Sequence, residues 1–436
     1  MWSLFSVLLA VGLLTIMIAW GKVQPLLAFV VAAMVAALML GMPLAKIPGA
    51  IEKGIGDLLG SLVVVICVGA VFGKLIADSG AARRIAMSLI DTLGPNRMPV
   101  AMTITGFVVG LPLYYNVGFV LMIPLIFSLV YTTGRPAVAL GMPLLAGLSI
   151  AHGFLPPHPS PTALVAAVHA DMGTTLLYGL VVAIPTLIIA GPVFAMTLKN
   201  IQARPAAIFR GEPKPDHELP GAFASFFTAL LPVALLAALT ATTMLRPDLA
   251  QSLAFFANPL VVMLASYLVA VFTLGLNRGQ TLPQVMSSAQ EALREIAPIL
   301  LIIAGAGGLK QVMTESGVSA QLGALLASLP VPPLLLAWAV ATLIRVCLGS
   351  ATVAGVTAAG IVGPLAESSG VNPNLMVLAV GAGSLMFSHV NDSAFWMFKE
   401  YFGLSLKDTF RSWSLMETLV GSVGIVFVLI LSLFVA

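Results

Sequence analysis

The chain has 436 residues, of which 59% are hydrophobic and only 8% are charged. Soluble domains carry charge on about a quarter of their residues, so this composition excludes an ordinary soluble protein. The formal net charge of +3 gives no sign of nucleic-acid binding. Apolar runs recur that can each cross a hydrocarbon layer about 30 Å thick as a helix. We therefore expect an all-α polytopic protein of the bacterial inner (cytoplasmic) membrane, surrounded by lipid bilayer.

In chain order, the first apolar run spans residues 3–20 and continues almost directly into a second. No basic segment precedes it, so we interpret it as a membrane helix and not as a cleaved signal. Cys67 and Cys347 lie in apolar segments without a second sulfur nearby, which indicates neither a disulfide framework nor a zinc site. The predicted crossings are 3–20, 24–42, 57–77, 137–168 (interrupted), 173–198, 222–245, 255–276, 294–314, 374–401 (interrupted) and 413–435.

Two further apolar stretches, about 99–133 and about 334–368, are broken at their midpoints. The breaks are LPLYYNVG, Leu111 to Gly118, and LGSATVAG, Leu348 to Gly355. Non-helical backbone at membrane depth is tolerated only where it is buried in protein or lines a polar cavity. We therefore expect each stretch to form a re-entrant hairpin that lines such a cavity.

The sequence divides into a first repeat (1–198), a cytoplasmic linker (199–221) and a second repeat (222–436). A constant shift of 237 residues relates the two repeats without a gap across both hairpins and both interrupted helices. Each repeat holds five crossings, an odd number, so the second must enter the membrane from the opposite side and the repeat is inverted. The matched pairs include Ser79 with Ser316, Pro95 with Pro332, Leu111 with Leu348, Gly118 with Gly355 and His152 with His389.

Basic residues give an independent test of this topology. With the linker in the cytoplasm, fourteen of the 20 Lys and Arg residues fall on the cytoplasmic side. Only Lys46, Lys53 and Arg246 fall on the opposite side. This bias follows the positive-inside rule and predicts that both termini are periplasmic.

Polar side chains inside the four breaks are the main functional signal, because such groups are costly at membrane depth and usually line a pathway. Half-helices that restart after a break present free N–H groups and a positive dipole end, which suit an anion. Hydroxyl and amide groups beside them suit a hydroxylated substrate. The predicted substrate-binding residues are Tyr114, Tyr115, Asn116, His152, His158, Ser160, Thr162, Ser350, Thr352, His389, Asn391, Asp392 and Ser393.

These residues predict a secondary carrier for a small hydroxylated carboxylate with proton coupling, without a catalytic residue, a metal or a cofactor. We assign the coupling to Asp392, the only acid in the four breaks, with His152 and His389 as the competing carriers of the proton. An isolated Ser or Thr, such as Ser160, commonly bonds to its own helix backbone instead of a ligand. Arg345 has three open roles: steadying the site, binding the anion, or pairing with an acid elsewhere.

Three motifs, GFLPPHPSPTA, GSATVAGVTAAGIV and HVNDSAFW, resemble the gluconate:proton symporter family over essentially the whole chain. The resemblance implies an ion-transporter-superfamily architecture, with scaffold helices holding a mobile transport domain of hairpins and broken helices. It also implies gluconate or a related sugar acid as the substrate, with D-serine or another hydroxy acid as the alternative, elevator-type movement, and a homodimer. The family pattern often has an acid at the position of Asn116 and a polar residue at that of Leu348, and this chain departs from both.

Two other classes of protein fit the sequence less well. An intramembrane hydrolase could use His152, His158, His389 and Asp392 as zinc ligands, but the sequence has no HExxH pair and a proline-rich break separates the first two. A passive channel would be expected to show rings of pore-lining residues. Two offset hairpins favour gates for alternating access.

Overall fold

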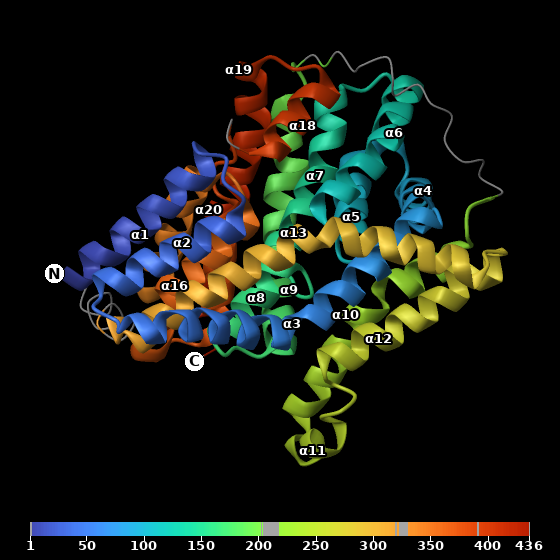
Figure 1. Cartoon of the computed structure of the whole chain (residues 1–436). Coiled ribbons are helices and arrows are strands. Elements are labelled where there is room, and N and C mark those ends of the chain that lie inside the picture. The colour runs from blue at the N-terminus through green and yellow to red at the C-terminus, as the bar shows by residue number, and fades with distance from the viewer. Residues whose placement is uncertain are drawn as a thin grey trace.

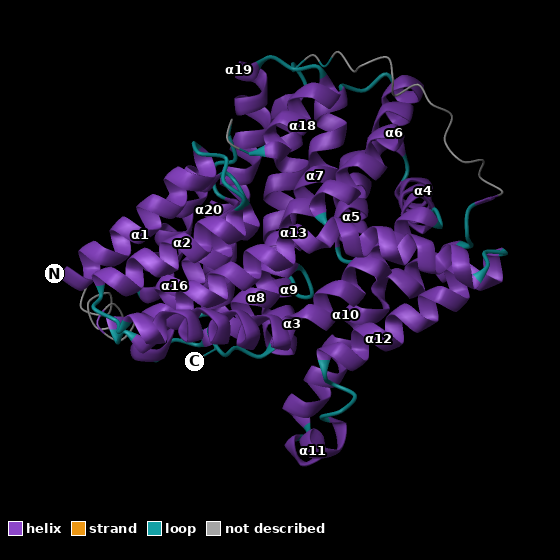
Figure 2. Cartoon of the chain, in the orientation of Figure 1, coloured by secondary structure: helices purple, strands orange, loops and turns teal. Residues whose placement is uncertain are grey.

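The computed structural model describes residues 2–201, 203, 218–318, 321, 330–389 and 392–435. Its described residues form helices and loops, and no strand occurs among them (Figure 2). Most of the linker predicted at 199–221, together with Asn391, lies outside the described residues.

The first half contains two helices that are interrupted by short non-helical segments. The chain leaves one helix at Gly110 and begins the next at Tyr115, and a second interruption separates Phe154 from Pro159. Pro156 and Pro157 lie in that second gap, where the missing proline N–H prevents a continuous helix. The helices are α1 (Trp2–Ala19), α2 (Pro25–Met39), α3 (Ile47–Asp78), α4 (Ala81–Leu93), α5 (Met98–Gly110), α6 (Tyr115–Thr133), α7 (Ala137–Phe154), α8 (Pro159–Ala167) and α9 (Met172–Ile188).

The second half is interrupted in the same two places. Gly349, with a φ of 77°, ends one helix in the left-handed conformation that glycine tolerates, and the next begins at Ala351. The other interruption separates Leu385 from Ser393. The helices are α10 (Ala222–Leu245), α11 (Ala250–Leu253), α12 (Pro259–Ala270), α13 (Leu282–Glu315), α15 (Pro333–Leu348), α16 (Ala351–Ser369), α17 (Pro373–Leu385), α18 (Ser393–Phe402), α19 (Leu406–Thr409) and α20 (Leu415–Leu431).

The number of long apolar helices is smaller than the ten predicted crossings. Six helical spans in the described residues are long and apolar enough to cross a membrane, or seven if the bent pair Leu44–Gly60 and Val63–Asp78 counts as one. The difference arises because caps and breaks shorten several segments: α2 has 15 residues and α17 has 13. Helix α4, of 13 residues, was not predicted. The chain is nevertheless a multi-pass membrane protein by the apolar helices it carries.

Two long helices, α3 and α13, pack against each other and extend across much of the molecule (Figure 1). Their backbones approach closely at glycines, since a Cβ added to Gly54 would lie 2.3 Å from the carbonyl oxygen of Gly307. Small residues at such crossings are typical of helix packing in membranes, where close van der Waals contact drives association.

The interior of the protein is built around α7 and α17. Nearly every residue of both helices is buried, so they contact protein and not lipid. They also approach closely, since a Cβ at Gly381 would lie 2.5 Å from the carbonyl oxygen of Gly153. Each of these two buried helices ends at an interruption, which places non-helical backbone deep inside the molecule.

Candidate functional site

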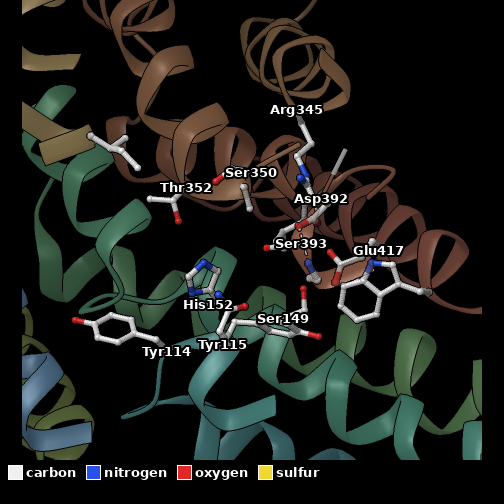
Figure 3. A pocket seen from close by; sticks show the side chains of 16 residues that line it. Tyr114, Tyr115, Ser149, His152, Arg345, Ser350, Thr352, Asp392, Ser393 and Glu417 are labelled. Atoms are coloured by element: carbon white, nitrogen blue, oxygen red, sulfur yellow. Dashed lines mark hydrogen bonds and ion pairs between the residues drawn. The ribbon is translucent and has the colours of Figure 1, made fainter. Parts of the chain in front are cut away.

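A cavity of about 230 Å³ opens between the interrupted helices (Figure 3). Its volume lies below the range of about 300–1,000 Å³ typical of drug-sized ligands, so it suits a small molecule. Its described lining residues are Tyr114, Tyr115, Asn116, Ser149, His152, Ile302, Arg345, Ser350, Ala351, Thr352, Leu385, Asp392, Ser393, Ala394, Trp413 and Glu417.

Three helices begin at this cavity. Helix α6 begins beside Tyr114, α16 follows the N-cap Ser350, and α18 follows the N-cap Asp392. The first N–H groups of a helix have no partner within the helix and carry the positive end of its dipole. The cavity is therefore electrostatically suited to an anion even before side-chain charges are considered.

A buried ion pair joins two of the interrupted helices at the cavity wall. Nη2 of Arg345, near the end of α15, donates to Oδ2 of Asp392, at the start of α18. The hydroxyl of Ser388 donates to the same oxygen at 2.5 Å, and the N–H of Ala394 donates to Oδ1 at 2.9 Å. Both oxygens of Asp392 are thus engaged, which stabilises the ionised carboxylate.

Ser388 connects this pair to the π-helical turn Phe410–Ser414, which leads directly into α20. The indole N–H of Trp413 donates to the Ser388 hydroxyl at 2.7 Å, and the Ser414 hydroxyl donates to the Ser388 carbonyl at 2.5 Å. Trp413 is 1% exposed, so its indole is fixed by packing as well as by this hydrogen bond. Ser388 and Asp392, between α17 and α18, are therefore held in place by buried polar contacts.

Arg345 retains donors that the protein does not satisfy. The residue is 3% exposed, and its Nε and Nη1 have no hydrogen-bond partner among the described residues. An unpaired buried donor is costly, and more so on a charged group. A guanidinium with free N–H groups at the edge of a cavity is well suited to bind a carboxylate.

Glu417 is a second buried acid of the cavity, on α20. It is 2% exposed, lies within electrostatic reach of Arg345 and Asp392, and is hydrogen-bonded to the side chain of Ser149. It makes no ion pair with a described residue. Figure 3 shows Glu417, Ser149 and Asp392 around one end of the cavity and Tyr114 and Thr352 toward the other.

Tyr114, Tyr115 and His152 line the other part of the cavity, and His158 packs against Tyr114 and His152 without lining it. The hydroxyl of Tyr114 donates to the Ile66 carbonyl at 3.0 Å, which anchors the start of α6 to α3. His152 and His158 lie edge to face with ring centroids 5.2 Å apart. A ring nitrogen of His158 is 2.7 Å from the Gly110 carbonyl oxygen, so His158 satisfies the backbone at the end of α5.

The structure brings together eight of the thirteen predicted site residues at the cavity: Tyr114, Tyr115, Asn116, His152, Ser350, Thr352, Asp392 and Ser393. His158, Ser160, Thr162 and His389 do not line it. Ser160 faces α16 instead, since a Cβ at Gly355 would lie 2.5 Å from its hydroxyl. His389 has its Nε2 3.0 Å from the Val346 carbonyl. Asn391 lies outside the described residues.

Sequence reasoning missed Ser149, Trp413 and Glu417 as lining residues. Glu417 carried a usable signal, because it is an acid inside the predicted crossing 413–435 and charged residues at that depth are costly. Ser149 carried none, since an isolated serine in an apolar helix most often bonds to its own backbone. For Arg345, the structure identifies the paired acid as Asp392.

Interrupted helices that converge on a buried polar cavity within a multi-pass membrane protein are typical of a membrane transporter. Residues 2–434 match the model of a family described as GntP family permease, and the chain belongs to that family. It is a permease and not an enzyme, so the hydrolase alternative does not apply. The described residues hold no group of three or more His, Cys, Asp or Glu residues placed to bind a metal ion.

Curated relatives match over almost the whole chain. The chain is 44% identical to a high-affinity gluconate transporter of Escherichia coli (strain K12), covering 98% of this chain and 99% of the relative. It is 43% identical to the Gnt-II system L-idonate transporter of the same organism, with 96% of each covered. It is 42% identical to a gluconate permease of Bacillus subtilis (strain 168), with 98% and 99% covered.

Two solved structures share the fold. The YdaH transporter of Alcanivorax borkumensis superposes with a TM-score of 0.69 at 16% identity, covering 94% of this chain and 97% of that one. MtrF of Neisseria gonorrhoeae superposes with a TM-score of 0.63 at 13% identity, covering 93% and 94%. At these identities the likeness concerns the fold alone.

The ion pair between Arg345 and Asp392 generates a stability prediction. Removing one partner of a buried pair costs about 3–5 kcal/mol because a buried charge remains uncompensated, whereas removing both charges costs much less. We expect Arg345→Gln and Asp392→Asn each to lower the thermal unfolding temperature of the purified protein, and the double variant to recover part of the loss. The exposed pair Arg246 and Asp248, neutralised in the same way, is the control and should change little. If the decreases in unfolding temperature of the two single variants added up in the double variant, a paired role for Arg345 and Asp392 would be contradicted.

Proposed function

We propose that this permease carries gluconate or a closely related sugar acid through the cavity bounded by α6, α7, α16, α18 and α20. The observation that carries the proposal is the pair of unsatisfied buried donors on Arg345, at a cavity where three helices begin. A substrate carboxylate in the cavity would satisfy one of these donors, and a substrate hydroxyl can satisfy the other. The relatives named for gluconate and L-idonate, at 42–44% identity over nearly full length, support the same class of substrate.

The remaining lining groups suit the hydroxyl-bearing part of a sugar acid. Ser350, Thr352 and Ser393 lie at helix starts on one wall, and Tyr115 and His152 lie opposite them. The Tyr115 hydroxyl and Nδ1 of His152 are buried without a hydrogen-bond partner among the described residues. Substrate hydroxyls can both donate and accept, so they match groups of either kind.

We further infer that transport is symport with protons and follows elevator-type alternating access. The two halves are interrupted at corresponding places, as an inverted repeat requires, and the stretches 98–133 and 333–369 act as the two re-entrant hairpins. The linker is assigned to the cytoplasm and both termini to the periplasm by the distribution of basic residues. A proton accompanying the anion neutralises the charge that would otherwise oppose uptake.

The substrate proposal predicts that recognition depends on the carboxylate and on the guanidinium. In a binding assay with purified protein, unlabelled gluconate and idonate should compete with labelled gluconate. Sorbitol, which has the hydroxyls but no carboxylate, should not compete. Arg345→Lys keeps the charge but loses the planar fork of donors, and should weaken binding by about tenfold or more, equivalent to roughly 1.4 kcal/mol.

Arg246→Lys, in an exposed loop, is the matched control and should bind as the wild type does. Sorbitol competing as well as gluconate, or Arg345→Lys binding at wild-type affinity, would contradict the proposal. If D-serine displaced labelled gluconate better than unlabelled gluconate does, the proposed substrate class would change, while the proposed binding site would stay the same.

The topology proposal predicts opposite accessibility at the two ends of α10. Gly221 and Ala250 are both exposed and flank this helix. In a protein with Cys67 and Cys347 changed to Ser, an impermeant thiol reagent added to intact cells should modify Ala250→Cys and leave Gly221→Cys unmodified. The reverse labelling pattern would invert the assignment.

A further inference from the structure

The cavity holds two buried acids and one buried cation, and this imbalance needs an explanation. Arg345 is 3% exposed and Glu417 is 2% exposed, and Asp392 is also buried. The charged and titratable groups that face Glu417 come from four other elements: Arg345 on α15, Asp392 at the start of α18, His152 on α7 and Tyr115 on α6. If both acids were ionised, the cluster would already carry one more negative charge than Arg345 compensates, and a substrate anion would add a second uncompensated buried charge, which is costly.

The two acids are not equivalent in their contacts. Asp392 accepts hydrogen bonds from the Arg345 guanidinium, the Ser388 hydroxyl and the Ala394 N–H, so its acceptor sites are filled by donors that favour the ionised form. Glu417 has no paired cation among the described residues. It lies in the first turn of α20, which continues directly from the π-helical turn Phe410–Ser414, and its hydrogen-bond partner is the Ser149 hydroxyl. A hydroxyl can donate to a carboxylate or accept from a carboxylic acid, so this contact accommodates both protonation states.

We propose that Glu417 is the proton-binding site of this carrier. The proton on Glu417 and the substrate carboxylate bind together, because Glu417 and the substrate carboxylate both depend on the positive charge of the single cation Arg345. The inference rests on the proposed function, since it requires an anionic substrate in this cavity. It assigns to Glu417 the coupling role that the sequence suggested for Asp392, which the structure pairs with Arg345.

Charge counting gives the stoichiometry. In the empty carrier, Arg345, ionised Asp392 and ionised Glu417 sum to one negative charge. In the loaded carrier, Glu417 is neutral and the substrate carboxylate supplies the second negative charge, so the sum is unchanged. One proton therefore enters and leaves with one substrate anion, and the transport cycle moves no net charge.

The same counting predicts the pH dependence of binding. Substrate binding requires protonated Glu417, so the affinity for gluconate should fall as pH rises, by up to about tenfold per pH unit for linkage to one proton. Glu417→Gln keeps the shape and stays neutral. It should bind gluconate with an affinity that no longer depends on pH, should retain counterflow exchange, and should lose accumulation driven by a pH gradient.

The experiment compares wild type, Glu417→Gln, Glu417→Asp and His152→Gln by gluconate binding across pH and by uptake into proteoliposomes with and without a pH gradient. Glu417→Asp retains a titratable group and should keep gradient-driven accumulation, which separates loss of coupling from failure to fold. His152→Gln should keep the pH dependence. Glu52→Gln, an exposed acid on α3, is the matched control and should behave as wild type.

Accumulation at the wild-type level by Glu417→Gln, or pH dependence that survives in Glu417→Gln and disappears in His152→Gln, would overturn the assignment. Failure of Glu417→Gln to bind gluconate at any pH, while Glu417→Asp binds, would make Glu417 a substrate ligand and overturn it as well. Absence of gluconate binding by the wild-type protein would instead overturn the proposed function.

Discussion

The ion pair between Arg345 and Asp392 is the interaction on which the candidate site depends. Each residue lies at an interruption, one near the end of α15 and the other at the start of α18, so the pair joins two helices that end inside the protein. Burying two charges is costly unless the geometry is good and further hydrogen bonds satisfy them. Ser388 and Ala394 supply those bonds to Asp392, while the remaining donors of Arg345 have no described partner.

This asymmetry gives the cavity its chemical character. The protein holds one carboxylate, that of Asp392, beside the Arg345 guanidinium. The Nε and Nη1 donors of Arg345 remain for a second anion. Around the same space, three helices present their first N–H groups, and hydroxyl groups from four helices line the wall. A site of this kind favours a small anion with several hydroxyl groups, because the helix starts and the Arg345 donors suit its carboxylate, and the hydroxyls of the wall can donate to its hydroxyls or accept from them.

Glu417 adds a charge that Arg345 cannot also neutralise. In the proposed coupling, the carrier has two states of equal charge, one with a carboxylate on Glu417 and the other with a carboxylate brought by the substrate. Coupling in this account needs no long-range pathway, because the proton and the substrate act on the same guanidinium. Burial of the cluster among α7, α17 and α20 strengthens these electrostatic interactions by excluding water.

The sequence predicted the positions of the four interruptions well, because proline, glycine and polar residues in apolar runs have direct physical consequences for a helix. Residues 155–158, and residues 386–389 and 392 among those described, are non-helical where Pro156 and the polar motif around Asp392 predicted breaks. The sequence did not reveal which side of each break faces the cavity. Ser160 and Thr162 lie in the predicted segment, yet the packing of α8 against α16 directs Ser160 away from the cavity. Pairings across the chain, such as Arg345 with Asp392, depend on tertiary contacts that periodicity and spacing do not encode.

The most direct measurement is an experimental structure of the carrier with gluconate bound at acidic pH. The account predicts that gluconate accepts hydrogen bonds from Nε and Nη1 of Arg345, with its carboxylate on one of the two donors, while Asp392 keeps its bond to Nη2. It also predicts that the gluconate hydroxyls face Ser350 and Thr352. Gluconate bound beside Ser160 and Thr162 at the start of α8, with no contact to Arg345, would contradict it.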